Sequence, residues 1–299
     1  METSDFDPAP GRPEAVGDGL RRVLAPNPSP MTFRGTNSYL LGRGEVTLID
    51  PGPDIPAHLA ALMAALDPGE RIVQILVTHS HADHSGLVPA VRAATGAPVL
   101  AFGDSFASRS PAMVALAARG LEGGEGRDAA FRPDGILADG AVVETAAGPL
   151  EALHTPGHFG NHLCFRLGET VFSGDLAMGW STSIVSPPDG DMGAYMASLA
   201  RLSALRPGRL LPGHGAPVAA PQERLAWLIA HRQERERQIL AALHPGPADA
   251  AALARRIYAD IPPAALPAAE RNVLAHLIDL RERGEVASSF PEVTRWTLR

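Results

Sequence analysis

The most constraining feature of this 299-residue sequence is a run of four potential metal ligands within six residues, His79-Ser80-His81-Ala82-Asp83-His84. The run follows Arg71–Val77, a β-branched stretch typical of a buried strand. Because alternate residues of an extended chain face the same side, His79 and His81 can converge on one ion. A tightening turn into the helix predicted at Leu87–Ala94 then directs Asp83 and His84 toward a second ion. A fold for this chain must therefore open this strand end onto a metal site.

Three further candidate ligands, His158, Asp175 and His214, each follow an apolar run elsewhere in the chain. Strands that stop at one edge can deliver side chains to a common point, and neighbouring glycines allow the sharp turns this requires. The sequence thus predicts two metal ions, the first held by His79, His81 and His158, the second by Asp83, His84 and His214, with Asp175 between them. Imidazole and carboxylate ligands suit Zn²⁺ best, with Fe or Mn as alternatives.

Two ions bridged by a carboxylate favour hydrolysis. They would lower the pKa of a shared water toward neutrality and stabilise the oxyanion formed on attack. The 26 cationic residues are all arginine, which excludes a Schiff-base lysine and a P-loop of the usual form, and no Gly-x-Ser-x-Gly motif occurs. We therefore expect a metal-bridging hydroxide as the nucleophile, with Asp83 both ligating a metal and orienting that hydroxide.

Composition excludes several other classes of protein. The formal charge of −7 gives no general electrostatic case for binding nucleic acid. The single cysteine, Cys164, excludes an intramolecular disulfide and any multi-cysteine metal site, and fits a reducing compartment. No apolar run approaches the roughly 20 residues of a membrane-spanning helix, and the N-terminus lacks a signal-peptide pattern. We expect a cytoplasmic protein with no membrane partner.

The chain is expected to divide into three parts. Residues 1–19, rich in proline, glycine and acids, are predicted to be a flexible leader. Residues 20–220 alternate strand-like and helical runs, which predicts an α/β catalytic domain with an insertion at residues 104–132 that is typical of a lid. Residues 221–299 predict a long linker helix, two more helices and a strand pair near Val286–Ser288 and Val293–Leu298, a small winged-helix-like α+β domain.

The ligand pattern His79-Ser80-His81-Ala82-Asp83-His84, followed in order by His158, Asp175 and His214, resembles that of the metallo-β-lactamase superfamily. The resemblance covers residues from about 20 to 220. It implies an αββα sandwich with a dinuclear site on one edge and the same division of ligands between two ions. The bridging aspartate and the absence of a cysteine ligand make the chain more similar to the glyoxalase II-like hydrolases than to antibiotic-degrading lactamases.

Residues 28–40 and the winged-helix-like tail are similar to the lactamase-β-2-like group. Its members include polyketide thioesterases and a mitochondrial endoribonuclease that acts on single-stranded RNA. The resemblance therefore implies a hydrolase but does not say which bond it cleaves. Residues 248–299 contain seven arginines and seven acidic residues, a balance that favours packing or homodimerisation over groove binding. We expect cleavage of an ester, a thioester or a related bond in a small molecule. The alternatives are a single-strand endoribonuclease with the same site, and an iron-binding redox or non-catalytic metal-binding protein.

A second group of residues is expected around the ligands. Asp50, which ends a predicted strand, is placed to hydrogen-bond a ligand histidine. His162 is predicted to act in catalysis by protonating a leaving group, or else to bond an outer carboxylate. Further positions expected to support the ligands or to face the substrate are Asn37, Tyr39, Asn161, Ser181 and Thr182. The unclustered histidines His58, His231, His244 and His276 are predicted to be surface or helix residues.

Overall fold

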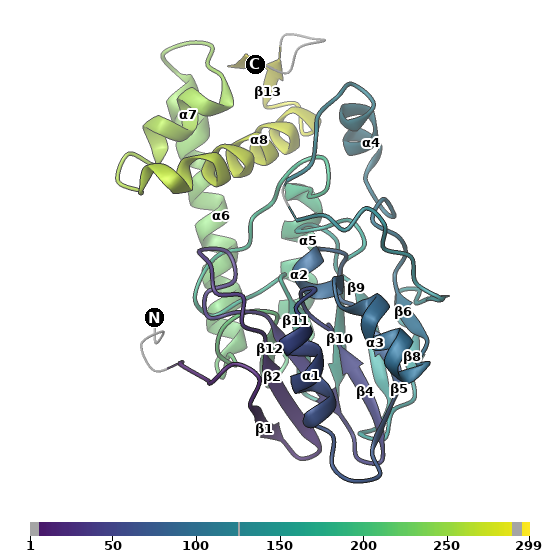
Figure 1. The fold of residues 1–299 in the computed structure, drawn as a ribbon. Coiled ribbons are helices and arrows are strands. Elements are labelled where there is room, and N and C mark those ends of the chain that lie inside the picture. Colours follow the sequence, from purple (N-terminus) through teal and green to yellow (C-terminus); the bar gives the residue numbers. More distant parts are fainter. Residues whose placement is uncertain (1–5, 125, 289–294) are drawn as a thin grey trace.

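The computed structural model describes residues 6–124, 126–288 and 295–299, which form two mixed β-sheets flanked by helices (Figure 1). The first sheet has the order β1-β2-β3-β4-β5-β6-β7 and the second has the order β12-β11-β10-β9-β8. The strands of the first sheet are β1 (Pro13–Gly17), β2 (Leu20–Leu24), β3 (Asn37–Leu41), β4 (Glu45–Ile49), β5 (Arg71–Leu76), β6 (Val99–Ala101) and β7 (Gly135–Ile136). Those of the second are β8 (Val142–Val143), β9 (Leu150–His154), β10 (Leu163–Leu167), β11 (Thr170–Gly174) and β12 (Arg209–Pro212).

The sheets pack face to face because their strands alternate apolar side chains between two cores. Tyr39 and Leu41 of β3 join Phe165 of β10 in the core between the sheets, whereas Leu40 points to the opposite side. Helices α1 (Pro56–Ala64) and α3 (Val88–Thr95) cover that outer face of the first sheet. Helices α5 (Met192–Ala204) and α6 (Pro221–Leu243) cover the outer face of the second sheet. The layer order is therefore αββα, and the expected α/β sandwich is confirmed.

The C-terminal segment forms a separate core at one end of the molecule (Figure 1). It contains α7 (Ala250–Ile257), the 3-10 turn η1 (Pro263–Ala265), α8 (Leu266–Glu282) and the antiparallel pair β13 (Val286–Ser288) and β14 (Trp296–Leu298). Helix α4 (Pro111–Ala117), from the predicted insertion, packs into the same core through Met113 and Leu116. Helix α6 connects this core to the second sheet, so the C-terminal module is continuous with the sandwich.

Local sequence signals account for several of these boundaries. Proline lies in the first turn of α1, α3, α4 and α6, where its missing N–H costs nothing. Asp191 caps α5 by accepting a hydrogen bond from the amide of Ala194 at 3.0 Å. None of the described helices combines the length and apolar character needed to cross a membrane.

The structure corrects two expectations. The prediction of a flexible leader over residues 1–19 is wrong for residues 13–17, because β1 pairs antiparallel with β2 from Pro13 opposite Val23 to Gly17 opposite Leu20, with a register shift between Ala15 and Gly17. Residues 1–5 of that leader lie outside the described residues, as do positions 293 and 294 of the strand expected at Val293–Leu298. His58 and His276 lie on helices as expected, but both are buried.

Candidate metal centre

The seven predicted ligands come together at one edge of the sandwich, on the four segments that follow β5, β9, β11 and β12. His79 and His81 follow β5, and Asp83 and His84 lie in the short helix α2 (Ala82–Ser85). The remaining three follow the ends of β9, β11 and β12 and are His158, Asp175 and His214. Because β11 and β12 are parallel, their ends place Asp175 and His214 at the same edge.

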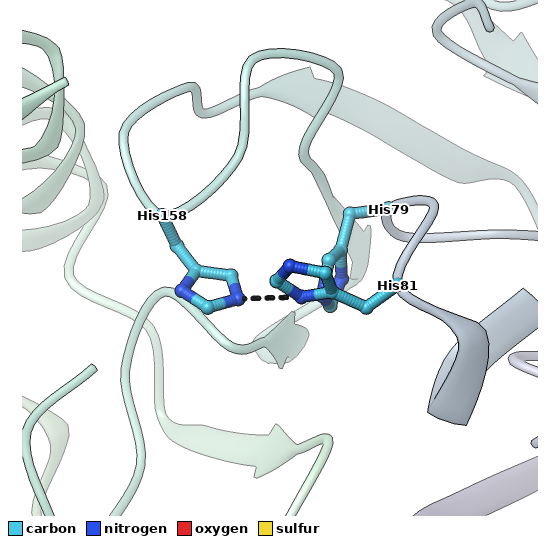
Figure 2. Close-up of side chains that lie close together, drawn as sticks. All are labelled: His79, His81 and His158. Atoms are coloured by element: carbon cyan, nitrogen blue, oxygen red, sulfur yellow. Dashed lines mark hydrogen bonds between the residues drawn. The ribbon is translucent and has the colours of Figure 1, made fainter. Parts of the chain in front are cut away.

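Three imidazoles converge on the first side of this centre. His81 Nδ1 lies 2.9 Å from His79 Nε2 and 3.0 Å from His158 Nε2. Figure 2 shows that His158 approaches from the loop after β9, opposite the two histidines that follow β5. Three ring nitrogens from two segments thus surround one point.

The second side is formed by Asp83, His84 and His214. His214 Nε2 lies 3.3 Å from His84 Nε2 and 3.3 Å from Asp83 Oδ2. Asp175 lies between the two sides, because its Oδ2 is 3.3 Å from His214 Nε2 and 3.7 Å from His158 Nε2. The Asp83 side chain is 29% exposed, whereas that of His84 is fully buried, so the centre opens to solvent on the Asp83 side.

The outward nitrogens of the ligand histidines are held by oxygen atoms of the protein. His158 Nδ1 lies 2.6 Å from the carbonyl oxygen of Ile184, and His214 Nδ1 lies 3.1 Å from that of Gly35. His84 Nδ1 lies 2.8 Å from Asp50 Oδ2. Each oxygen favours a hydrogen on Nδ1, which leaves the Nε2 lone pair directed into the centre.

Asp50 lies where the sequence predicts an outer carboxylate. It ends β4 with a φ of 52°, in the left-handed region, and its Oδ1 accepts a hydrogen bond from the Thr78 amide at 2.7 Å. Its Oδ2 accepts another from the Thr78 hydroxyl, also at 2.7 Å. One carboxylate therefore fixes both His84 and the chain immediately before His79.

The two sides differ in their electrostatics. Burial, reinforced by neighbouring histidines, lowers the pKa of His79 well below 6.5 and that of His81 to about 3. Burial also acts to lower the pKa of His84 and His214, but Asp83 and Asp175 more than offset it. They raise the pKa of His84 well above 6.5 and that of His214 to about 10. Without metal, one side therefore carries neutral imidazoles and the other carries imidazolium–carboxylate pairs.

These residues fit a pair of divalent ions. Ligand atoms about 2.0–2.1 Å from a tetrahedral zinc ion lie about 3.3 Å from one another, close to the spacings of the inward nitrogens here. Asp175 Oδ1 is buried and has no hydrogen-bond partner among the described residues. Its cationic neighbour is His84 Nε2 at 3.5 Å, and a buried carboxylate oxygen without a hydrogen bond is costly unless a cation satisfies it. The donor set and the unpartnered oxygen both match what two metal ions require.

His162, for which the sequence predicts proton transfer, lies behind the ligand Asp175. It is fully buried, with Nδ1 2.9 Å from the Thr155 hydroxyl, and its Nε2 accepts a hydrogen bond from the Asp175 amide at 3.2 Å. Both ring nitrogens are therefore engaged inside the protein. These contacts favour the alternative of a supporting role, in which His162 holds the Asp175 backbone from behind, and proton transfer by His162 stays a prediction.

Asn37 and Tyr39 lie beneath the centre and do not line its opening. The Asn37 amide donates to the carbonyl oxygens of Pro212 and Gly215, both at 2.9 Å. The Tyr39 hydroxyl donates to the same Pro212 carbonyl at 2.7 Å. Both side chains are buried, so they anchor the loop that carries His214 from below.

The remaining predicted positions lie in neighbouring loops. Asn161 is buried and donates to the Ser80 hydroxyl at 2.9 Å and to the Asp104 carbonyl at 3.0 Å, which fastens the loop of the first histidines. Ser181 and Thr182 are half-buried in the loop after β11, and their contact with substrate stays a prediction. Sequence reasoning missed Ser183, whose hydroxyl donates to the carbonyl of Asp175, and Ile184, which acts only through its backbone.

Comparisons with known proteins identify the family. A family model described as the metallo-beta-lactamase superfamily matches residues 31–214. The chain belongs to this superfamily. A beta-lactamase-associated winged helix domain matches residues 250–296. The first match confirms the expected class of metal-dependent hydrolase, and the second confirms the C-terminal winged helix.

Individual superfamily members extend this result. A beta-lactamase-like protein 2 homolog from Drosophila melanogaster is 33% identical over 279 residues, covering 90% of this chain and 89% of the relative. An atrochrysone carboxyl ACP thioesterase from Aspergillus fumigatus is 34% identical over 227 residues, covering 74% and 64% respectively. The crystal structure of a metallo-beta-lactamase family protein from Thermus thermophilus matches with a TM-score of 0.76 and 28% identity, over 95% of this chain and all of the other.

Proposed function

We propose that this superfamily member hydrolyses a thioester of a small molecule with two divalent metal ions, zinc foremost. The observation that carries the proposal is the convergence of inward-facing imidazole nitrogens and carboxylates at one strand edge, with Asp175 between the two groups. The first ion would be held by His79, His81 and His158, the second by Asp83, His84 and His214, and both by Asp175. A thioesterase among the relatives at 34% identity supports the choice of bond.

When bound, the two ions supply a water acidic enough to attack near neutral pH and stabilise the negative charge that develops on the attacked carbonyl oxygen. Asp83 lies at the open side and orients this water by accepting a hydrogen bond from it. Asp50 and the backbone oxygens of Gly35 and Ile184 hold the ligand histidines in place throughout. Little movement of the protein is then needed during the reaction.

The enclosed position of His162 favours a substrate whose leaving group needs no acid. In thioester hydrolysis the water oxygen bonds to the carbonyl carbon, the C–S bond breaks and the sulfur leaves with the bonding electrons. The water proton passes to solvent. A thiol has a pKa of about 8.5, so its thiolate departs without general-acid help, unlike the far more basic alkoxide of an ester. This difference ranks a thioester above an ordinary ester.

The test is turnover of a substrate panel by zinc-loaded and chelator-treated protein. The panel contains an acyl thioester of N-acetylcysteamine, a lactone, a p-nitrophenyl ester, bis(p-nitrophenyl) phosphate and a short single-stranded RNA. We expect the thioester to have the highest kcat/KM, chelation to abolish turnover and restored zinc to recover it. Turnover that survives full metal removal would contradict the proposal, as would RNA cleavage as the fastest reaction with affinity falling by several logs per log of salt.

Two aspartate variants provide a matched comparison. Asp175→Ala is expected to lose metal binding and thioester turnover together, because it removes the carboxylate placed between both groups of ligands. Asp67→Ala removes a carboxylate that is 64% exposed and lies outside the centre, and it is expected to retain both properties. Activity retained by Asp175→Ala would refute the assignment.

A further inference from the structure

The loop after β11 contains the backbone oxygen that orients one of the ligand histidines. Ile184 presents its carbonyl to His158 Nδ1 at 2.6 Å. Carboxylates, backbone carbonyls and waters all supply such outer contacts, and the direction of a backbone carbonyl is set by the loop that carries it. The direction of the His158 ring therefore depends on what holds residues 183–185.

Two side chains of the C-terminal helices hold the peptides on either side of this carbonyl. Arg232 of α6 donates through Nη2 to the carbonyl oxygen of Ser183. Asn272 of α8 accepts through Oδ1 from the amide of Val185 at 3.0 Å. The residue before and the residue after Ile184 are thus both fixed by hydrogen bonds from the C-terminal part of the chain.

The two side chains also orient each other. Arg232 Nη1 donates to Asn272 Oδ1 at 3.1 Å, and Asn272 Nδ2 donates to the carbonyl oxygen of Ala268 one turn earlier in α8 at 3.0 Å. The Asn272 oxygen therefore receives two hydrogen bonds while its nitrogen is anchored to its own helix. This arrangement leaves the amide one orientation.

Burial indicates that packing alone does not explain these residues. Arg232 is 1% exposed and Asn272 is 8% exposed, and in the described part of the chain no carboxylate forms an ion pair with Arg232. Removing a guanidinium charge from water is costly, and an apolar side chain of similar volume packs at least as well. What an apolar side chain cannot do is bond the peptides around Ile184.

Other C-terminal arginines bond the same loop. Arg224 of α6 donates to the carbonyl oxygens of Met178 at 2.7 Å and Ser181 at 2.6 Å. Arg271 of α8 donates to the carbonyl oxygen of Pro187 at 3.4 Å. Helices α6 and α8 therefore hold the loop at several points along its length, and Figure 1 shows α8 lying across the end of the sandwich above it.

We propose that Arg232 and Asn272 are positioning residues for the metal centre, through which the C-terminal module sets the direction of the His158 ring. The inference rests on the metal ligation proposed above. In this proposal the C-terminal module helps to hold His158, a ligand of the first ion. His214 is held by Gly35, in a different segment, so the second ion shares only Asp175, whose carbonyl accepts from the Ser183 hydroxyl, with the loop held by Arg232 and Asn272.

The test is titration of metal-free full-length protein with Co²⁺, followed by visible absorption and competition with a chelator. Asn272→Leu removes the acceptor for Val185 and Arg232 while keeping a similar volume. We expect wild type to bind two ions and Asn272→Leu to bind one of them about 10–100-fold more weakly, with an altered visible spectrum, and the other to be weakened less. Asn272→Asp keeps the accepting oxygen and is expected to retain affinity close to that of wild type.

Val273→Ala is the matched control. Val273 is adjacent in sequence and buried in the C-terminal core, so its truncation weakens that core without touching residues 183–185. It is expected to bind both Co²⁺ ions as wild type does. Unchanged affinity and spectrum in Asn272→Leu would overturn the inference, and so would equal weakening in Val273→Ala. A wild type that binds no Co²⁺ would instead overturn the metal centre itself, so the two failures are distinguishable.

Discussion

Gly213 offers a direct steric probe of the metal centre. A Cβ added at this position would lie 2.5 Å from Asp175 Oδ1 and 2.6 Å from His84 Cε1. Ordinary van der Waals contact begins at 3.4 Å, so the two contacts would be too short by 0.9 Å and 0.8 Å. Metal–ligand distances tolerate displacements of only about 0.2 Å. The Gly213→Ala variant must therefore move at least one of these two ligands out of position.

The expected result for Gly213→Ala is a loss of metal affinity of about 100-fold or more, together with about 1–3 kcal/mol of folding stability lost to overpacking. Metal content after dialysis against a graded chelator series measures the first quantity, and urea unfolding measures the second. Gly179→Ala is the control, because its added Cβ meets Val218 at an ordinary 3.4 Å. Wild-type affinity and turnover in Gly213→Ala would show that Asp175 and His84 do not hold metal.

Three further predictions follow from contacts around and away from the centre. Asp50→Asn removes the negative charge and turns one accepting oxygen into an NH2 donor, so at least one of the three hydrogen bonds from Thr78 and His84 is lost. We expect metal affinity to fall about 10–100-fold in the same dialysis assay; unchanged affinity would contradict the role given to Asp50. Binding of Zn²⁺ near pH 7.5 should release at least one proton, because the carboxylates raise the pKa of His84 and His214 in the metal-free protein; calorimetry in buffers of different ionisation enthalpy measures this release, and none would contradict it. His276 is buried and its pKa is lowered to about 3, so as the pH falls the unfolded chain binds a proton at this histidine before the folded chain does. Between pH 7 and pH 5 the free energy of unfolding of metal-free wild type, measured in urea, should therefore fall by about 2 kcal/mol more than that of His276→Leu. Equal pH slopes for the two proteins would refute this.

The ligand cluster could be predicted because its information is local. His79, His81, Asp83 and His84 follow a recognisable buried strand, and the other ligands each follow an apolar run that ends in a glycine turn. The sequence could not show which way a nearby side chain faces. His162, Asn37 and Tyr39 were correctly placed near the centre, yet the loops they bond come from 7 to 178 residues away in the chain.

The errors have a similar origin. Strand β1 was missed because Pro13 and Gly17 weaken the local signal, while its pairing with β2 stabilises it in the folded chain. Arg232 begins a charged stretch that is typical of a solvent-facing helix surface, and only the packing of α8 against α6 buries it. Its contact with the loop after β11 joins residues 49 positions apart, which no local pattern reveals.

The number of divalent ions bound per chain tests the account most directly. Purified protein should be stripped of metal, equilibrated with Zn²⁺, dialysed and analysed by inductively coupled plasma mass spectrometry. We predict two zinc ions per wild-type chain and fewer than one in Asp175→Ala. A wild-type content of one or none at saturation, or two ions in Asp175→Ala, would contradict a dinuclear centre bridged by this carboxylate.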